Sequence, residues 1–474
     1  MRKYTLTTLL SLLFVQFTFA QQDFTLYNLN EVPQSNYSNP SNQFNGNWYI
    51  GLPALSSSYV SLSNSGFAYS DAVKQRSSDL LLDFNALINE IEDENYLSFH
   101  TKIDLLSFGI KLSERTQLNV NVSENASFKF SYPKDFIRFV YEGNASFEDN
   151  TANLNGIGIN AIHYREYGIG VSHQFTQKLR LGLRAKYLYG MENIYSKTTD
   201  ISIRTDPNTY AITATADIEI QTAGLDDVDF DEEGVSSYLT GRSNSGFAVD
   251  FGANYELNEK ISLNASVLDL GFISWKDYTT TYSSKGQFEY SGIEIDAFGQ
   301  GNTPGGETSF DRVGDSLEEA FDLDTSYAGY TAPLTGRIYL GGNYKLNDRS
   351  FAGVLIQSEV YRSSVRPSFT AHYNRKMNKW ITLSGSYTII NRSYNNLGVG
   401  LILNPGPVQF YVVSDNLMGA FRPQHARHVQ VRFGINLIFG SDKNTELRPN
   451  FRGVVESGKD RKSDKTNEDN SSDE

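Results

Sequence analysis

Residues 429–440 read VQVRFGINLIFG, and this stretch decides the fold class. Apolar side chains occupy every second position, and the positions between them are mostly polar or small: Val429, Val431, Phe433, Ile435, Leu437 and Phe439 against Gln430, Arg432, Gly434, Asn436, Ile438 and Gly440. Successive side chains of a strand point to opposite faces, so a period of two predicts a β-strand with one apolar face. A strand of about ten residues is long for a soluble sandwich and long enough to cross a membrane.

The same alternation recurs along the chain, at 179–189, 247–255, 261–267, 338–344, 381–389 and 397–403. Short polar connectors between strands lie at 113–116, 176–178, 256–260, 345–350, 375–379 and 404–407. Six such turns pair twelve strands, and an opening strand within about 50–69 and the closing strand at 429–440 make fourteen. The sequence therefore predicts an all-β fold, a transmembrane antiparallel β-barrel with an even number of strands. Twelve or sixteen strands are alternatives, because 201–204 and 210–220 also have strand character and would extend a hairpin beyond the membrane.

The connections on the other side of the predicted barrel are longer. Four of them span about 70–102, 131–160, 194–246 and 274–335, which is the asymmetry of barrels with long extracellular loops. All three tryptophans, Trp48, Trp275 and Trp380, fall at predicted strand ends, where aromatic girdles meet the membrane interface. Residues 80–91 in the first long loop predict an amphipathic helix, as a lid over the barrel mouth or as a docking surface.

Composition excludes several classes of protein. The 474 residues include no cysteine, which excludes a disulfide scaffold and a thiolate metal site. No run after the first twenty residues approaches the roughly 18–20 apolar residues of a membrane-spanning helix. With 55 acidic against 41 basic residues the formal charge is -14, so a basic nucleic-acid footprint is missing. Because no nucleophile or phosphate-binding motif is present, we expect neither an enzyme nor a cofactor.

The two ends of the chain differ from its body. Residues 1–20 predict a secretion signal, with Arg2 and Lys3 before an apolar run and cleavage near Ala20, so we expect an outer-membrane location. Residues 21–46 are rich in Asn, Ser, Pro and Gln and have no strand pattern, which fits a plug inside the barrel or a flexible periplasmic leader. The barrel would span 47–440, and 441–474 predict a polar disordered tail, with a periplasmic tether as the alternative.

Charged residues at the positions between the apolar ones predict the lining of the lumen. If the apolar positions face lipid, the inward-facing candidates include Arg180, Arg184, Lys186, Asp250, Arg337 and Arg432. Arg180, Arg184 and Lys186 share one strand face and would form a basic ladder that attracts an anionic group such as a carboxylate. The favoured alternative is a self-neutralised network with Asp250, Glu166 and Glu359.

One acidic run in the third long loop is a weak calcium candidate. Asp227, Asp229 and Asp231 alternate there and offer hard oxygen ligands. An EF-hand would also need Gly at position 232 and Glu at 238, where this chain has Glu and Tyr, so a solvated acidic loop is the favoured interpretation. We expect no other metal site, because the six histidines do not cluster in the sequence.

Several longer stretches carry a resemblance to a known family: 32–37 (VPQSNY), 49–53 (YIGLP), 244–252 (NSGFAVDFG), 266–275 (SVLDLGFISW) and 414–417 (SDNL). Over about 21–440 the chain resembles the FadL-like outer-membrane barrels, specifically a family from gliding and type IX-secreting bacteria known only as a domain of unknown function. The resemblance implies fourteen strands, an N-terminal plug over about 21–46 and inward movement of hydrophobic compounds.

Two functional hypotheses follow from this resemblance and from the loops. The first is uptake of a hydrophobic or amphipathic small molecule through the barrel. The alternative is a non-transporting barrel that serves as an accessory of a secretion or gliding envelope complex through its long loops and tail. The expected partners are outer-membrane lipid and either a hydrophobic small-molecule ligand or an envelope protein, with no nucleic acid.

Overall fold

A computed structural model describes residues 23–76, 79–147, 151–206, 208, 211–225, 243–290, 324–361, 364–390 and 393–441. Three predictions fall outside these residues: the secretion signal at 1–20, the calcium candidates Asp227, Asp229 and Asp231, and the tail beyond residue 441.

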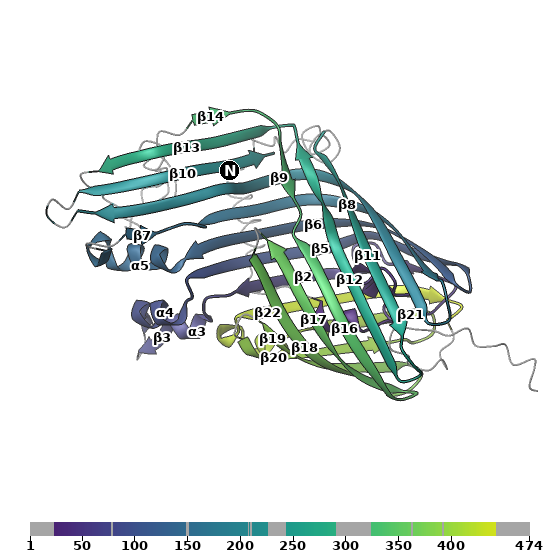
Figure 1. The fold of residues 1–474 in the computed structure, drawn as a ribbon. Coiled ribbons are helices and arrows are strands. Elements are labelled where there is room, and N and C mark those ends of the chain that lie inside the picture. The colour runs from purple at the N-terminus through teal and green to yellow at the C-terminus, as the bar shows by residue number, and fades with distance from the viewer. Residues whose placement is uncertain are drawn as a thin grey trace, which may run out of the picture.

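The described strands form one closed antiparallel ring. Each strand of the ring pairs with a neighbour on both sides, and the last pairs with the first, so the sheet closes into a barrel (Figure 1). The ring has fourteen positions, the first of which is shared by two short strands, and this confirms the predicted count. In ring order the strands are β1 (Trp48–Gly51) with β2 (Ser58–Asn64), β5 (Glu94–Ser113), β6 (Thr116–Pro133), β8 (Gly158–Gln174), β9 (Leu179–Thr205), β11 (Ser245–Glu256), β12 (Ile261–Trp275), β16 (Gly336–Asn347), β17 (Ser350–Tyr361), β18 (Ser364–Lys376), β19 (Ile381–Ile390), β20 (Ser393–Leu403), β21 (Val408–Ser414) and β22 (His428–Phe439).

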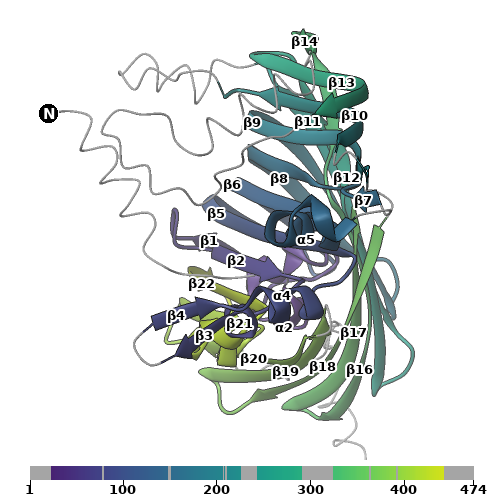
Figure 2. The ribbon, with the colours of Figure 1, turned by 90° about the vertical axis from the view of Figure 1, so that its left-hand side faces the viewer.

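The six predicted tight turns join consecutive strands of this ring at one end of the barrel, which we call the turn side. The other end, the loop side, faces the viewer in Figure 2. It carries α3 (Tyr69–Ala72), β3 (Val73–Arg76), β4 (Asp79–Leu82), α4 (Phe84–Glu90), α5 (Lys134–Glu142), η2 (Asn144–Phe147), β7 (Thr151–Asn153), β14 (Asp324–Ser326), β15 (Tyr330–Pro333), α8 (Leu417–Phe421) and η3 (Pro423–His425). None of the helices in the described ranges is long and apolar enough to span a membrane.

The helix predicted over residues 80–91 is shorter than expected. Residues 79–82 form β4, which pairs with β3 in a separate two-stranded sheet. The helix α4 begins only at Phe84, because the side chain of Asp83 accepts a hydrogen bond of 3.0 Å from the backbone N–H of Ala86 and caps the first turn.

Of the described ring strands, β9 is the longest and extends well beyond the barrel on the loop side. β9 is 27 residues long, whereas a tilted strand crosses a membrane in about 9–11 residues. Its outer part pairs with β10 (Ile212–Ala223), which in turn pairs with β13 (Thr279–Tyr290). The predicted extension of a hairpin by 201–204 and 210–220 is confirmed, and we call β9, β10 and β13 together the loop-side sheet (Figure 1). The short strands β7 and β14 pair with its two edges.

The burial of side chains is the reverse of that in a soluble protein. In β19, Leu383 and Tyr387 are 42% and 40% exposed, whereas Ser384 and Ser386 between them are buried. The other ring strands repeat this pattern, with apolar side chains outside and polar ones inside. A closed ring satisfies the strand N–H and C=O groups internally, and an apolar outer face suits lipid. Together these features are the architecture of a membrane-spanning barrel.

The tryptophans divide into two groups. Trp48 and Trp380 are 39% and 53% exposed next to turn-side strand ends, as expected for a girdle. Trp275 is fully buried and packs with Leu188, Ile273 and Tyr330, so its predicted place in a girdle is wrong. The reason is the register shift in β12 at residues 268–269, after which the buried side chains fall at odd positions, so that Ile273 and Trp275 face inward.

Candidate lumenal site

The segment at residues 23–47 lies inside the barrel; we call it the N-terminal segment. It contains α2 (Phe24–Tyr27) and η1 (Pro33–Tyr37), and most of its side chains are buried. Phe24 and Tyr27 pack against side chains of β12, β16 and β17, whereas Leu26 and Leu29 pack against β20 and β21. The segment therefore crosses the lumen between different parts of the wall.

Two ion pairs attach the N-terminal segment to the barrel wall. Asp23 accepts two hydrogen bonds from the guanidinium of Arg432, at 2.9 and 2.8 Å, and both side chains are buried. Glu31 binds Lys376 at 3.0 Å nearer the turn side. The bidentate geometry of the first pair fixes the start of the segment in one orientation.

Asp415, which follows β21, attaches the same end of the segment through its backbone. Its carboxylate accepts hydrogen bonds from the N–H of Phe24 at 3.0 Å and from the N–H of Thr25 at 2.8 Å. Burial raises the pKa of Asp415 to about 6, although the bonds from Thr25 and Phe24 oppose this shift.

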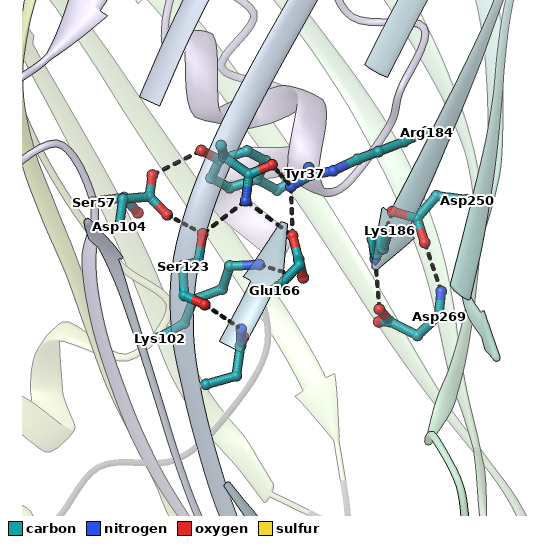
Figure 3. A network of polar contacts seen from close by, with 12 residues as sticks. Tyr37, Ser57, Lys102, Asp104, Ser123, Glu166, Arg184, Lys186, Asp250 and Asp269 are labelled. Atoms are coloured by element: carbon teal, nitrogen blue, oxygen red, sulfur yellow. Dashed lines mark hydrogen bonds and ion pairs between the residues drawn. The ribbon is translucent and has the colours of Figure 1, made fainter. Parts of the chain in front are cut away.

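Tyr37 anchors the middle of the N-terminal segment (Figure 3). Its hydroxyl donates to Asp104 at 2.7 Å, and Asp104 also accepts from Ser123 at 2.8 Å. The cations of Lys102 and Arg184 lie 5.1 and 4.3 Å from the centre of its ring, within cation–π range. One tyrosine of the segment thus contacts residues of β5 and β9 at once.

Two glycines allow the segment to touch the wall. Gly182 of β9 and Gly252 of β11 lie directly opposite each other in the sheet. A Cβ atom at Gly182 would lie 2.1 Å from the carbonyl carbon of Pro40, and one at Gly252 would lie 2.2 Å from the Oδ1 of Asn39. Because real Cβ atoms essentially never come closer than 3.0 Å, only glycine fits at either position with the segment in place. We call this pair the glycine seat.

Of the charged residues predicted to face the lumen, Arg337 is half-buried and the others are buried, and most of them take part in a set of neighbouring ion pairs that we call the network. Lys186 binds Asp250 and Asp269, each at 2.6 Å (Figure 3). Arg337 also binds Asp269. Arg184 binds Glu166 at 2.7 Å, and Arg432 binds Asp23. Arg180 is buried nearer the turn-side end of β9 and is not part of the network.

Opposite charges balance within this network. Its six cations are Lys102, Lys129, Arg184, Lys186, Arg337 and Arg432, and its six carboxylates are Asp23, Asp104, Glu166, Asp250, Asp269 and Glu359. Each cation lies within ion-pair distance of a carboxylate, as Lys102 does of Glu166 (3.0 Å) and Lys129 of Glu359 (2.9 Å). The arrangement corresponds to the self-neutralised alternative rather than to an open basic ladder.

Sequence reasoning missed Asp269, the centre of this network. β12 has a bulge here, where the pairing with β11 shifts register and Asp269 adopts a left-handed backbone with φ of 60°. The bulge breaks the period of two on which the prediction of inward positions rested. An aspartate between Leu268 and Leu270, the one charged residue of this strand, was the signal that would have found it.

A cavity lies on the loop side of the N-terminal segment. It holds about 1180 Å³ of empty space, part of which opens to solvent. Tyr37 and Asp23 of the segment line it together with the cations of the network. Apolar and aromatic side chains complete the lining: Tyr59, Ile162 and Leu334. The lining is therefore amphipathic. Across the described ranges, no group of three or more His, Asp or Glu side chains is placed to hold a metal ion.

Comparisons with known proteins give one family match and several distant likenesses. Among solved structures, the chain is similar to the toluene transporter TodX of Pseudomonas putida (10% identity, 89% of this chain and 98% of that chain covered, TM-score 0.36). It is also similar to a FadL homologue of Pseudomonas aeruginosa (9% identity, 90% and 100% covered, TM-score 0.38). A third is the COG4313 outer membrane channel of Pseudomonas putida F1 (8% identity, 84% and 97% covered, TM-score 0.33).

No curated protein matches the chain. Residues 40–415, in contrast, match the model of a family of unknown function, DUF5723. The matched stretch begins inside the N-terminal segment and ends after β21, so it covers most of the barrel. The chain belongs to the family of unknown function DUF5723.

Proposed function

We propose that this protein is an outer-membrane channel that admits an amphipathic small molecule and that its N-terminal segment is the gate. The observation that carries the proposal is the position of the segment, which crosses the lumen directly below a cavity that opens on the loop side. A molecule that enters this cavity meets Tyr37 and Asp23 of the segment before it can go further. We propose no catalytic role.

The contacts that hold the segment suit a part that moves. Many of them are hydrogen bonds and ion pairs, such as those of Asp23, Glu31 and Gln34, and water can replace such contacts when the segment leaves. If the secretion signal is cleaved near Ala20, the segment has a free end a few residues before Asp23. It can then withdraw from the lumen while the ring of strands stays closed.

The cavity lining supports an amphipathic guest rather than a hydrocarbon. Its ion pairs and hydroxyl groups would be poorly solvated by a purely apolar molecule, and its aromatic wall offers little to a small ion. A molecule with a polar head and a short apolar part satisfies both regions.

The test is the conductance of the refolded barrel in a planar bilayer, compared with a variant that lacks residues 21–46. We expect closed wild-type barrels and a conducting variant, because removal of the segment leaves the lumen open. Heat-modifiable migration in gel electrophoresis checks that both barrels are folded. The proposal would be contradicted if neither the wild type nor the deletion variant conducts, or if both conduct equally.

A second candidate function is favoured by the loop-side sheet. β9, β10 and β13 extend beyond what a membrane crossing needs, and an exposed sheet is a surface on which another protein can dock. We propose as the alternative that the barrel is an accessory of a secretion or gliding envelope complex. A photo-crosslinker at Thr215, which is exposed on β10, should then give one defined adduct in intact cells. Normal uptake with no adduct would exclude this alternative.

A further inference from the structure

We propose that the cavity selects a guest whose head group carries hydroxyl or amide groups and no net charge. This inference rests on the proposed function, because it assumes that the cavity is where the transported molecule binds. It narrows the amphipathic class to molecules built like an alkyl glycoside and disfavours alkyl carboxylates. Three features of the cavity support it: the pairing of its charges, its unused hydrogen-bonding groups and its apolar wall.

The first feature is that the cavity offers no unpaired charge to an ionic guest. The six cations of the network lie against carboxylates, and Lys129 and Glu359, which line the cavity, are 2.9 Å apart and about 15% exposed. A carboxylate guest would have to displace one of these carboxylates from its cation. Breaking a partly buried ion pair leaves one charge without a partner, which is strongly unfavourable.

The second feature is a set of polar side chains that have no hydrogen-bond partner among the described residues. Ser98 of β5, Ser127 of β6, Asn160 of β8 and Thr335 before β16 all line the cavity. The sheet register places Ser98 and Asn160 on either side of Lys129, and Ser127 lies beside His100 and Ile162 in the next row. These side chains form a patch of neutral donors and acceptors on adjacent strands. Several hydroxyl groups of one guest could bind to such a patch at the same time.

The third feature is the apolar wall next to these groups. Tyr59, Ile162 and Leu334 line the same cavity. An aromatic or aliphatic side chain packs against a sugar ring face or a short alkyl chain without any charge requirement. The neutral patch and the apolar wall together match one molecule with an uncharged polar head and a short tail.

Equilibrium dialysis tests the inference with the full-length mature protein in phosphatidylcholine nanodiscs. The two radiolabelled probes are hexyl β-glucoside and hexanoate, which share the six-carbon tail and differ in the head group. Partition into empty nanodiscs is subtracted for each probe. We expect the glucoside to bind at least about tenfold more tightly than hexanoate to the wild type, because hexanoate must break an ion pair.

A variant that removes one charge should change the affinity for hexanoate in the opposite direction and so provides a second test. Glu359→Gln leaves the ammonium of Lys129 without its carboxylate, so hexanoate should bind roughly tenfold more tightly than to the wild type, with little change for the glucoside. The matched control is Glu219→Gln, which breaks a 2.9 Å pair with Lys197 on the loop-side sheet, outside the cavity. It should leave both affinities unchanged.

The inference is overturned if the wild type binds hexanoate as tightly as the glucoside, if it binds neither probe, or if Glu359→Gln gives no gain for hexanoate. Its failure is distinguishable from failure of the channel proposal. Glucoside binding to a barrel whose conductance is the same with and without residues 21–46 would support the ligand class and refute the gate. A barrel that conducts only without residues 21–46 but does not bind the glucoside would support the gate and refute the ligand class.

Discussion

Substitution of one residue of the glycine seat, Gly182→Val, should open the channel without damage to the barrel. The side chain of residue 182 would enter the space that the backbone of Pro40 and Ser41 now fills. The wall itself should tolerate the change, because β-branched residues favour strands more than glycine does. The barrel should therefore fold with the N-terminal segment displaced from its seat.

The size of the effect follows from the contacts. The first added carbon would lie 2.1 Å from Pro40, and ordinary contact begins at 3.4 Å, so the segment must shift by about 3.4 − 2.1 = 1.3 Å. A shift of this size breaks the bonds from Asn39 to Tyr27 (3.2 Å) and from Ser266 to Ser38 (2.6 Å). At about 1 kcal/mol for each bond and 1–3 kcal/mol for overpacking, docking weakens by roughly 3–5 kcal/mol. The ratio of open to closed barrels should rise by roughly two to three and a half orders of magnitude, since about 1.4 kcal/mol corresponds to tenfold.

The assay is single-channel recording in planar bilayers with three proteins. Gly182→Val is compared with the wild type and with Gly385→Val, whose added Cβ meets no atom within 4 Å on the outer face of β19. The Gly385→Val barrel carries the same substitution within a strand, and its channel should stay closed. Heat-modifiable migration confirms that each barrel is folded.

Two results would refute the reasoning. A folded Gly182→Val barrel that stays as closed as the wild type, while deletion of residues 21–46 opens it, would mean that the glycine seat does not hold the segment. Equal opening in Gly182→Val and Gly385→Val would mean that valine acts through the strands and not through the segment.

Three further outcomes are expected. Arg432→Leu leaves Asp23 buried without its partner and should weaken docking of the segment by about 3–5 kcal/mol, seen as faster protease cleavage of the segment, with Arg432→Lys intermediate. Because burial raises the pKa of Asp415 from 3.8 to about 6, the folded protein binds this proton more tightly than the unfolded chain does. The contribution of Asp415 to stability should thus increase as pH falls from about 6 to 4, by on the order of 3 kcal/mol, and the thermal midpoint of Asp415→Asn should lack this change. In brominated lipid, a variant that retains only Trp380 should be quenched strongly and one that retains only Trp275 weakly, because the two side chains are 53% and 0% exposed; equal quenching would contradict this assignment.

The local pattern was sufficient to predict the ring of strands. Each membrane crossing repeats apolar and polar positions with a period of two, and each turn-side connection is short and polar, so strand positions and count follow from neighbouring residues alone. The prediction failed where the period of two is interrupted. Trp275 ends a strand as expected, yet the register shift at residues 268–269 of β12 turns it to the inner face, where it is buried.

The candidate site depended much more on tertiary structure. The sequence indicated that Arg184, Lys186 and Arg432 would face inward, because strand parity fixes the face of a side chain. It also named Glu166 and Asp250, which pair with Arg184 and Lys186. It did not indicate Asp23 or Asp269, since Asp23 lies 409 positions from Arg432 and the bulge at Asp269 reverses the local parity.

What the sequence determined by itself was therefore the barrel: its strands, its turns and the polarity of its two faces. These properties are set by side-chain alternation over about ten residues at a time. Only the tertiary structure decided that residues 23–47 lie within the lumen, that the glycine seat receives them and that opposite charges in the wall balance. Each of these features joins groups far apart in the chain, and closure of the ring is what brings them within contact distance.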